Sequence, residues 1–354
     1  MDISEGYTKV DDNPIFHSSV EAFEEDELNE SLGLLLEHNS RVLAAHEVLS
    51  FNLADGFTRD LFEICDVLMV SIEVKVYAAL VLNKFIAAIK EKTTRMYREQ
   101  NNFSPEEVHE LMREIIMKDL RLRMVSVVQI ASKMHFLSFT PRMDEIVSHI
   151  KQRSIDINPV TPEELVESEV VVLKAIEFDV LMSKSPVAYL EAVFQFFILK
   201  HAEDYLIDVK SYWKAVLQLL EITFISYGEP FKFAIKLCKK SKPKCSPFLD
   251  RPSMSHLQMD YLLLVCGILC IPAWRLHGKH EATRIARSLS SSFYLDYEHV
   301  LAMASGIIVF MTVDQKVHAT THKLLAKFDE LLFSMRTDSV KRRRIVRKRP
   351  ANDF

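Results

Sequence analysis

Glycine is scarce in this 354-residue sequence, which contains only seven. β-Hairpins and phosphate-cradling loops need glycine where the backbone adopts positive φ, so the scarcity favours helices joined by short loops. No glycine-rich phosphate loop, nucleophile elbow or protein-kinase signature occurs. We therefore expect a protein that is not an enzyme.

The sequence also lacks a disulfide framework, a secretory signal and a bilayer-spanning run. Its five cysteines show no paired zinc spacing, and Cys266 and Cys270 lie within the apolar run 262–274, where we expect core thiols. That run is too short to cross a bilayer and contains a proline, so it predicts a buried helix. Residues 1–30 are acidic, unlike a signal peptide. We expect a reducing compartment and no membrane partner.

A metal site has little support in the sequence. His318 and His322 lie four residues apart, which could place two ligands on one helix face. Neither a third ligand nor a general-base glutamate stands at the required spacing. We predict no metal and no cofactor.

Charge is concentrated at the two ends of the chain. Residues 1–30 contain ten acidic residues and one lysine, whereas residues 336–354 contain eight Lys or Arg and two Asp. The part between them is nearly neutral, which does not suit a protein that binds nucleic acid over its whole surface.

Helical patterns run through the whole body, and no segment reads as a strand. Ser104 and Thr161 each precede a Pro-Glu-Glu sequence, which is a capping box that starts a helix. After a break near residue 184 the expected helices are 186–199, 203–227, 255–271, 280–292, 296–312 and 317–335. We predict an all-α fold with a disordered acidic segment 1–28, a helical domain 29–183, a second helical domain 184–335, and a disordered basic tail 336–354.

Glu169 is the residue that fits a plain core least well. Its neighbours three and four residues away are all apolar, namely Leu165, Val166, Val172 and Leu173. A carboxylate in such a stripe needs a cation or a hydrogen-bond donor. Lys133, which ends the preceding apolar helix, is the candidate partner, and the alternative is that each charge reaches solvent separately.

Three motifs in order resemble the cyclin box. Ala131-Ser132-Lys133 is similar to the Ala-Ser-Lys motif of its third helix, and residues 169–180 resemble the Glu…Leu-Lys…Phe-Asp segment of its fifth helix. Residues 79–86 resemble the second-helix motif, with Asn83 at the position of the usual Asp. The resemblance implies tandem cyclin-like helical domains, of which the first is clear and the second rests on helical character alone.

A narrower resemblance is carried by residues 120–133, 163–169 and 188–191, with a long insertion at about 93–115. These segments are similar to the cyclin N-terminal domain-containing protein 1 family, also called crossover site-associated proteins. That family implies a regulatory or scaffold protein that promotes the designation and maturation of meiotic crossovers. It also implies a cyclin-dependent kinase and meiotic recombination factors as partners, an indirect association with DNA, and a nuclear location on chromosomes at recombination sites.

The resemblance implies a kinase-facing surface at Lys133 and Glu169, with Asn83 and Arg59 as further interface residues. About where cyclins carry the Trp of their substrate-docking patch, this chain carries Cys65. The departures at Asn83 and Cys65 motivate an alternative, an interaction scaffold that binds no kinase. The basic tail motivates another, a nucleic-acid-associated factor with the cyclin fold.

The basic cluster near the end of the chain has three readings: a nuclear import signal, an arm that contacts phosphates, and a solvated end. We favour import because the cluster is short and terminal. Its residues are Lys341, Arg342, Arg343, Arg344, Arg347, Lys348 and Arg349. Ser246 precedes a proline within a lysine-rich segment and is our candidate phosphorylation site.

Overall fold

The computed structural model describes residues 25–45, 51, 53, 55–100, 104–135, 146, 148, 161–180, 185–205, 209–241, 254–314 and 318–348. Every element within these residues is a helix, and none is a strand. The fold is therefore all-α, as the sequence predicted.

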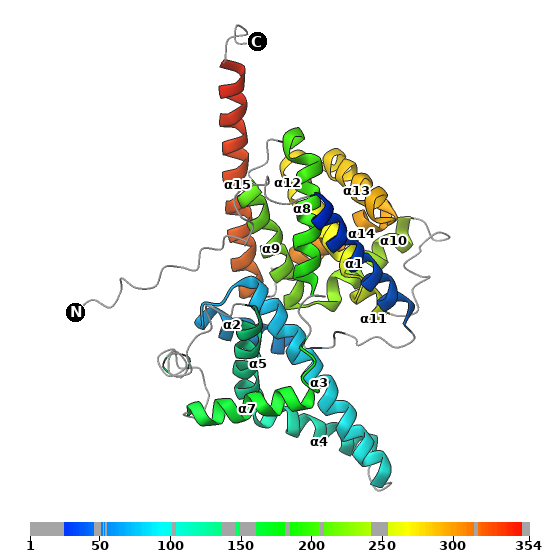
Figure 1. The fold of residues 1–354 in the computed structure, drawn as a ribbon, viewed down its shortest axis with the longest axis vertical. Helices are drawn as coiled ribbons and strands as arrows, with labels where there is room; N and C mark the ends of the chain where they lie inside the picture. Colours follow the sequence, from blue (N-terminus) through cyan, green and yellow to red (C-terminus); the bar gives the residue numbers. More distant parts are fainter. Residues whose placement is uncertain are drawn as a thin grey trace, which may run out of the picture. The chain divides into compact units, whose positions relative to one another are not determined.

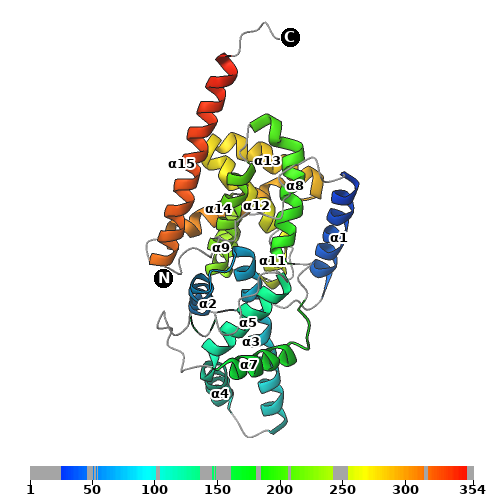
Figure 2. The same cartoon turned by 60° about the vertical axis from the view of Figure 1, so that its left-hand side comes forward.

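The chain divides into two compact units (Figures 1 and 2). The larger unit comprises Met1–Ser50, Pro186–Thr223 and Tyr227–Phe354, and the smaller unit comprises Phe51–Ser185 and Phe224–Ser226. The long segment of the smaller unit ends two residues beyond the domain boundary that we expected at 183.

The smaller unit is built around one central helix. Its helices are α2 (Asp55–Val67), α3 (Ile72–Gln100), α4 (Pro105–Lys118), α5 (Leu120–His135) and α7 (Pro162–Ala175). Helix α5 packs against α2, α3 and α7. Its side chains Met124, Val125 and Val127 have no exposed surface, and even Ser126 is fully buried. The apolar, small-residue sequence of α5 therefore matches its position in the core.

The two predicted capping boxes are present at the starts of α4 and α7. Ser104 Oγ accepts from the Glu107 amide, and Thr161 Oγ1 accepts from the Glu164 amide, each at 3.2 Å. Each glutamate returns the contact by accepting from the cap residue's amide at 2.8 Å. The amide and side chain of Ser104 hold the pKa of Glu107 below its ordinary value. These contacts satisfy amides that would otherwise lack partners, which fixes both helix starts.

The insertion expected at about 93–115 is mostly helical. Helix α3 continues to Gln100, and α4 begins at Pro105. The two helices pack against each other, and Thr94 donates to the Met112 sulfur at 3.8 Å. The insertion thus lengthens α3 and adds α4.

The larger unit surrounds a second central helix, α12. Its helices are α1 (Glu25–Ala44), α8 (Pro186–Tyr205), α9 (Val209–Ile225), α10 (Gly228–Ser241), α11 (Met254–Gln258), α12 (Tyr261–His277), α13 (Lys279–Phe293), α14 (Tyr297–Asp314) and α15 (Ala319–Lys348). Every residue from 261 to 273 is buried, including Cys266 and Cys270, as the apolar run predicted. Helices α1, α8, α13, α14 and α15 all contact it.

Helix α1 belongs to the larger unit, so placing it in the first domain was wrong. Asn39 Nδ2 donates to Asp260 Oδ1 at 3.0 Å, and Tyr189 Oη donates to the Leu35 carbonyl at 2.8 Å. His38 Nδ1 lies 2.9 Å from the same tyrosine oxygen. These contacts join α1 to α8 and to the start of α12. The helix also begins at Glu25, inside the segment expected to be disordered, and the residues before it lie outside the described ones.

Helix α10 is the largest omission of the sequence prediction, which placed no helix between 227 and 255. The helix packs against α14 more extensively than any other described pair of helices pack. Phe231 and Ala234 are fully buried on its inner face, while Lys232 and Lys236 lie on its outer side. The segment is an amphipathic helix, which the sequence prediction missed because the segment is rich in lysine.

Helix α15 extends beyond its predicted end at residue 335 and reaches Lys348. The expected disordered tail 336–354 is therefore helical over most of its length. Arg349 and the residues after it lie outside the described ones.

One described helix, α14, is long and apolar enough to cross a bilayer by length and composition alone. The same properties belong to core helices, and α14 buries Val300, Met303 and Ile307 in a unit where it packs against α10 and α12.

Candidate functional site

Glu169 lies on helix α7, which has one buried face and one exposed face. Helix α7 begins at the Thr161 cap and packs on α5, with Leu165 and Val172 completely buried. Glu169 lies on the same side and keeps only 7% of its surface exposed. The sequence predicted this burial of a carboxylate beside apolar neighbours.

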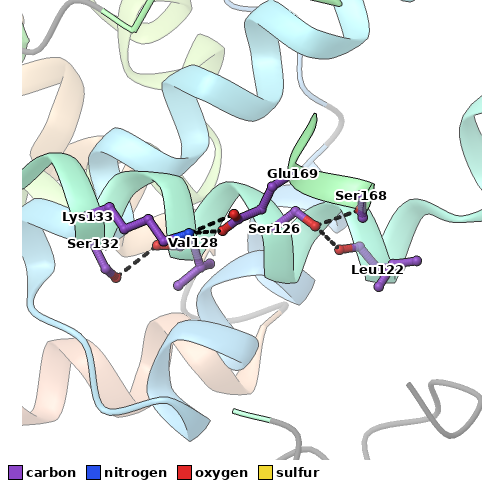
Figure 3. Close-up of polar contacts among 7 residues, drawn as sticks. All are labelled: Leu122, Ser126, Val128, Ser132, Lys133, Ser168 and Glu169. Atoms are coloured by element: carbon purple, nitrogen blue, oxygen red, sulfur yellow. Dashed lines mark hydrogen bonds and ion pairs between the residues drawn. The ribbon is translucent and has the colours of Figure 1, made fainter. Parts of the chain in front are cut away.

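Lys133 is its partner, as predicted. The lysine Nζ lies 2.8 Å from Glu169 Oε1 and 2.6 Å from Oε2, so the ammonium group bridges both carboxylate oxygens (Figure 3). Helix α5 carries the lysine and helix α7 the glutamate. The alternative, in which the two charges reach solvent separately, is wrong.

The ion pair is asymmetric in its exposure. The Lys133 side chain is 44% exposed, whereas the Glu169 side chain is only 10% exposed. A carboxylate has about four lone-pair positions, and the ammonium group occupies one on each oxygen. Glu169 therefore retains acceptor capacity on both oxygens, and a small part of its side chain is exposed.

A buried serine pair fixes the spacing of α5 and α7 beside the ion pair. Ser126 Oγ lies 3.0 Å from the Leu122 carbonyl and 2.6 Å from Ser168 Oγ (Figure 3). A serine has one hydroxyl proton, so Ser126 donates it to the carbonyl and Ser168 donates to Ser126. Ser132 Oγ likewise donates to the Val128 carbonyl at 2.8 Å. Small, satisfied hydroxyls allow the two helices to approach closely.

Exposed apolar side chains accompany the ion pair. Val166 is 48% exposed and Val170 is 40% exposed, three residues before and one after Glu169 on α7. Met134, next to Lys133, is 47% exposed. We call Lys133, Met134, Val166, Glu169 and Val170 the paired-charge surface. The sequence had placed Val166 within a buried stripe, which is wrong because α7 is apolar around most of its circumference.

Phe178 is a further exposed residue that the sequence reasoning did not select. It follows α7 and is 61% exposed, and both it and Glu177 have positive φ, at 58° and 56°. Bulky residues adopt this conformation only when their surroundings enforce it. The unusual backbone presents an aromatic ring to solvent, and positive φ at two consecutive residues is not visible in the sequence.

Helix α3 holds the backbone that follows Phe178. Lys84 forms an ion pair with Asp179 and also donates to the Asp179 carbonyl at 3.0 Å. Tyr77 Oη donates to the Val180 carbonyl at 2.6 Å. Burial, and then the charge of Asp179, raise the pKa of Tyr77 well above its ordinary value, so the hydroxyl remains a donor. The turn is thereby fixed at both of its last residues.

The other predicted interface residues have different surroundings. Asn83 on α3 is only 5% exposed, so its side chain belongs to the interior and our placement of it on a kinase-facing surface is corrected. Arg59 on α2 is half-buried and donates to Ser226 Oγ at 3.3 Å. Cys65 has no exposed surface. Cys65 itself therefore contributes nothing to an exposed docking patch.

The remaining candidate sites contribute no chemistry to this surface. No group of three His, Cys, Asp or Glu side chains within the described residues has the geometry to hold a metal ion. His318, one of the two histidines considered from the sequence, has its Nε2 3.7 Å from Asp314 Oδ1. Ser246 lies outside the described residues. The cluster from Lys341 to Lys348 lies on the last turns of α15.

No protein-family model matches the chain, and no curated protein matches it significantly.

Proposed function

We propose that this chain is a cyclin-like regulatory or scaffold protein that promotes the designation and maturation of meiotic crossovers, with a cyclin-dependent kinase as its partner. The kinase would bind the paired-charge surface together with Phe178. The meiotic role rests on the sequence resemblance alone. In this proposal the chain acts in the nucleus at recombination sites and catalyses nothing itself.

The observation that carries the proposal is the state of Glu169. Its carboxylate is nearly buried and held by one half-exposed lysine, and the exposed residues Met134, Val166 and Val170 lie within three positions of the pair on the same two helices. A partner that covers these apolar side chains would desolvate the pair and strengthen every hydrogen bond that Glu169 accepts. An ion pair that served only to stabilise the fold would not need exposed apolar side chains near it on the same two helices.

Co-purification with a panel of cyclin-dependent kinases tests the proposal. We expect the wild-type chain to retain at least one kinase and the double variant Lys133→Ala, Glu169→Ala to retain none. Arg95→Ala, which breaks the exposed Arg95–Glu91 pair on α3, is the matched control and should behave as wild type. Failure of the wild type to bind any kinase, or normal crossover formation with the double variant, would refute the kinase-partner proposal.

A second proposal, an interaction scaffold that binds no kinase, is favoured by the burial of Asn83 and Cys65. Two positions that cyclins use for recognition are then unavailable in this chain. Affinity purification from meiotic cells separates the two proposals, since a scaffold would recover recombination factors without a kinase.

A further inference from the structure

Helix α15 consists of two parts with different surroundings. Its first half buries an apolar face that contacts α12 and α14, and Asp329 forms an ion pair of 2.7 Å with Arg275 on α12. The buried residues are Leu325, Phe328, Leu332 and Met335. Their helical spacing would continue at Ser339 and Arg342, which are polar.

The second half, residues 336–348, extends away from the other helices of its unit. Both views show this red end of α15 projecting beyond them (Figures 1 and 2). Thirteen helical residues span roughly 20 Å at about 1.5 Å per residue. We call residues 336–348 the basic extension.

The basic extension carries seven Lys or Arg and one Asp, a net charge of +6. Cations are favourable near a helix C-terminus because of the helix dipole, but like charges three and four residues apart repel one another. A polyanion that neutralised these charges would therefore also stabilise the helix.

We propose that the basic extension binds the phosphate backbone of duplex DNA, independently of base sequence. An α-helix with side chains is about 10–12 Å across, and the major groove of B-DNA is about 12 Å wide. The major groove of double-stranded RNA is too narrow to admit an α-helix. The extension contains no aromatic residue, so it lacks the stacking groups of single-strand binders. The inference is independent of kinase binding.

The measurement is the fluorescence anisotropy of a labelled random-sequence duplex with the full chain, over a series of salt concentrations. If all six net charges neutralise phosphates, log Kobs should fall with log salt at a slope of about −5. Replacing Arg343, Arg344 and Arg347 by Gln should reduce the steepness of that slope by about 3. The control replaces the exposed Lys279, Lys323 and Lys327 of the same unit by Gln and should leave the slope unchanged.

A helix-breaking variant separates the contribution of the helical conformation to DNA binding from the contribution of the charges. Val340→Pro leaves every charge in place but interrupts the helix before the basic cluster, so we expect weaker duplex binding. Unchanged affinity would contradict binding as a helix. The proposal would be overturned if the wild type did not bind the duplex at about 50 mM salt, or if the control variant lost as much affinity as the triple variant. Binding to phosphatidylserine vesicles in preference to the duplex would also overturn it. So would a triple variant that loses nuclear import but keeps its DNA affinity.

Discussion

At the scale of single residues, the ion pair between Lys133 and Glu169 could be predicted because charge stands out in an apolar helix. What the sequence could not give is the direction in which Val166 and Val170 point. Helix α7 has apolar residues on most of its circumference, so several rotations about its axis bury comparable area. Contact with α5 selects one rotation, in which Leu165 and Val172 are buried and Val166 and Val170 are exposed.

Removing the lysine should expose the energetic role of the pair. Lys133→Ala leaves a carboxylate that is 10% exposed without its cation, so we expect a loss of about 1–3 kcal/mol in the free energy of unfolding. Urea denaturation measures it. Arg95→Ala, at a pair in which both side chains are well exposed, should cost less than about 1 kcal/mol. Equal effects of the two substitutions would contradict the burial of Glu169.

The thiol of Cys238 should react slowly in the folded protein. Burial, and then the nearby Glu298 and Asp296, raise its pKa to about 11, so little thiolate exists at pH 8. We expect alkylation by iodoacetamide to be about a hundredfold slower than for a free cysteine. Peptide mapping by mass spectrometry measures the rate, and unfolding in guanidinium chloride should restore it. Rapid native labelling of this residue would contradict the assignment.

At the scale of elements, helix starts were predicted best because capping is local chemistry. Ser104 and Thr161 carry the whole signal within four residues. Helix α10 was missed and α15 was ended too early, because lysine and arginine are good helix formers that composition alone assigns to loops. The membership of α1 in the larger unit depends on partners more than 150 residues away, such as Tyr189 and Asp260. No local pattern reveals such contacts.

The cap of α7 should contribute measurably to the smaller unit. Thr161→Ala removes the acceptor for the Glu164 amide, and we expect a loss of about 1 kcal/mol in the free energy of unfolding. Thr161→Ser keeps the hydroxyl and should behave as wild type. Thermal unfolding followed by circular dichroism compares the two variants, and a neutral Thr161→Ala would argue against the cap.

Two helical glycines should respond oppositely to alanine. A Cβ at Gly306 on α14 would lie 2.5 Å from the Pro230 carbonyl and 2.8 Å from the Ala234 amide of α10. Backbone atoms cannot move aside cheaply, so Gly306→Ala should destabilise by about 1–3 kcal/mol. At Gly33 nothing lies within 4 Å, and Gly33→Ala should stabilise by about 0.5–1 kcal/mol. Chemical denaturation of both variants checks the close approach of α10 and α14.

At the scale of the whole molecule, the all-α class followed from the scarcity of glycine and the helical periodicity, and the two units follow the break near residue 184. Each unit surrounds one central helix, α5 or α12, and α12 is also the least polar helix of its unit. The function is less determined by the fold, because the same helical architecture suits a kinase regulator, a scaffold and a DNA-associated factor. The distinction lies in which surfaces bind.

The most direct test of the central proposal is the affinity of the full chain for the kinase that co-purifies with it, measured by calorimetry for wild type and two surface variants. Val170→Asp places a charge on the paired-charge surface. Leu199→Asp places one on α8 of the larger unit, at a residue whose exposure is similar to that of Val170. We expect at least a hundredfold loss for Val170→Asp, about 3 kcal/mol, and no change for Leu199→Asp. Unchanged affinity of Val170→Asp, or an equal loss in both variants, would contradict binding at Lys133 and Glu169.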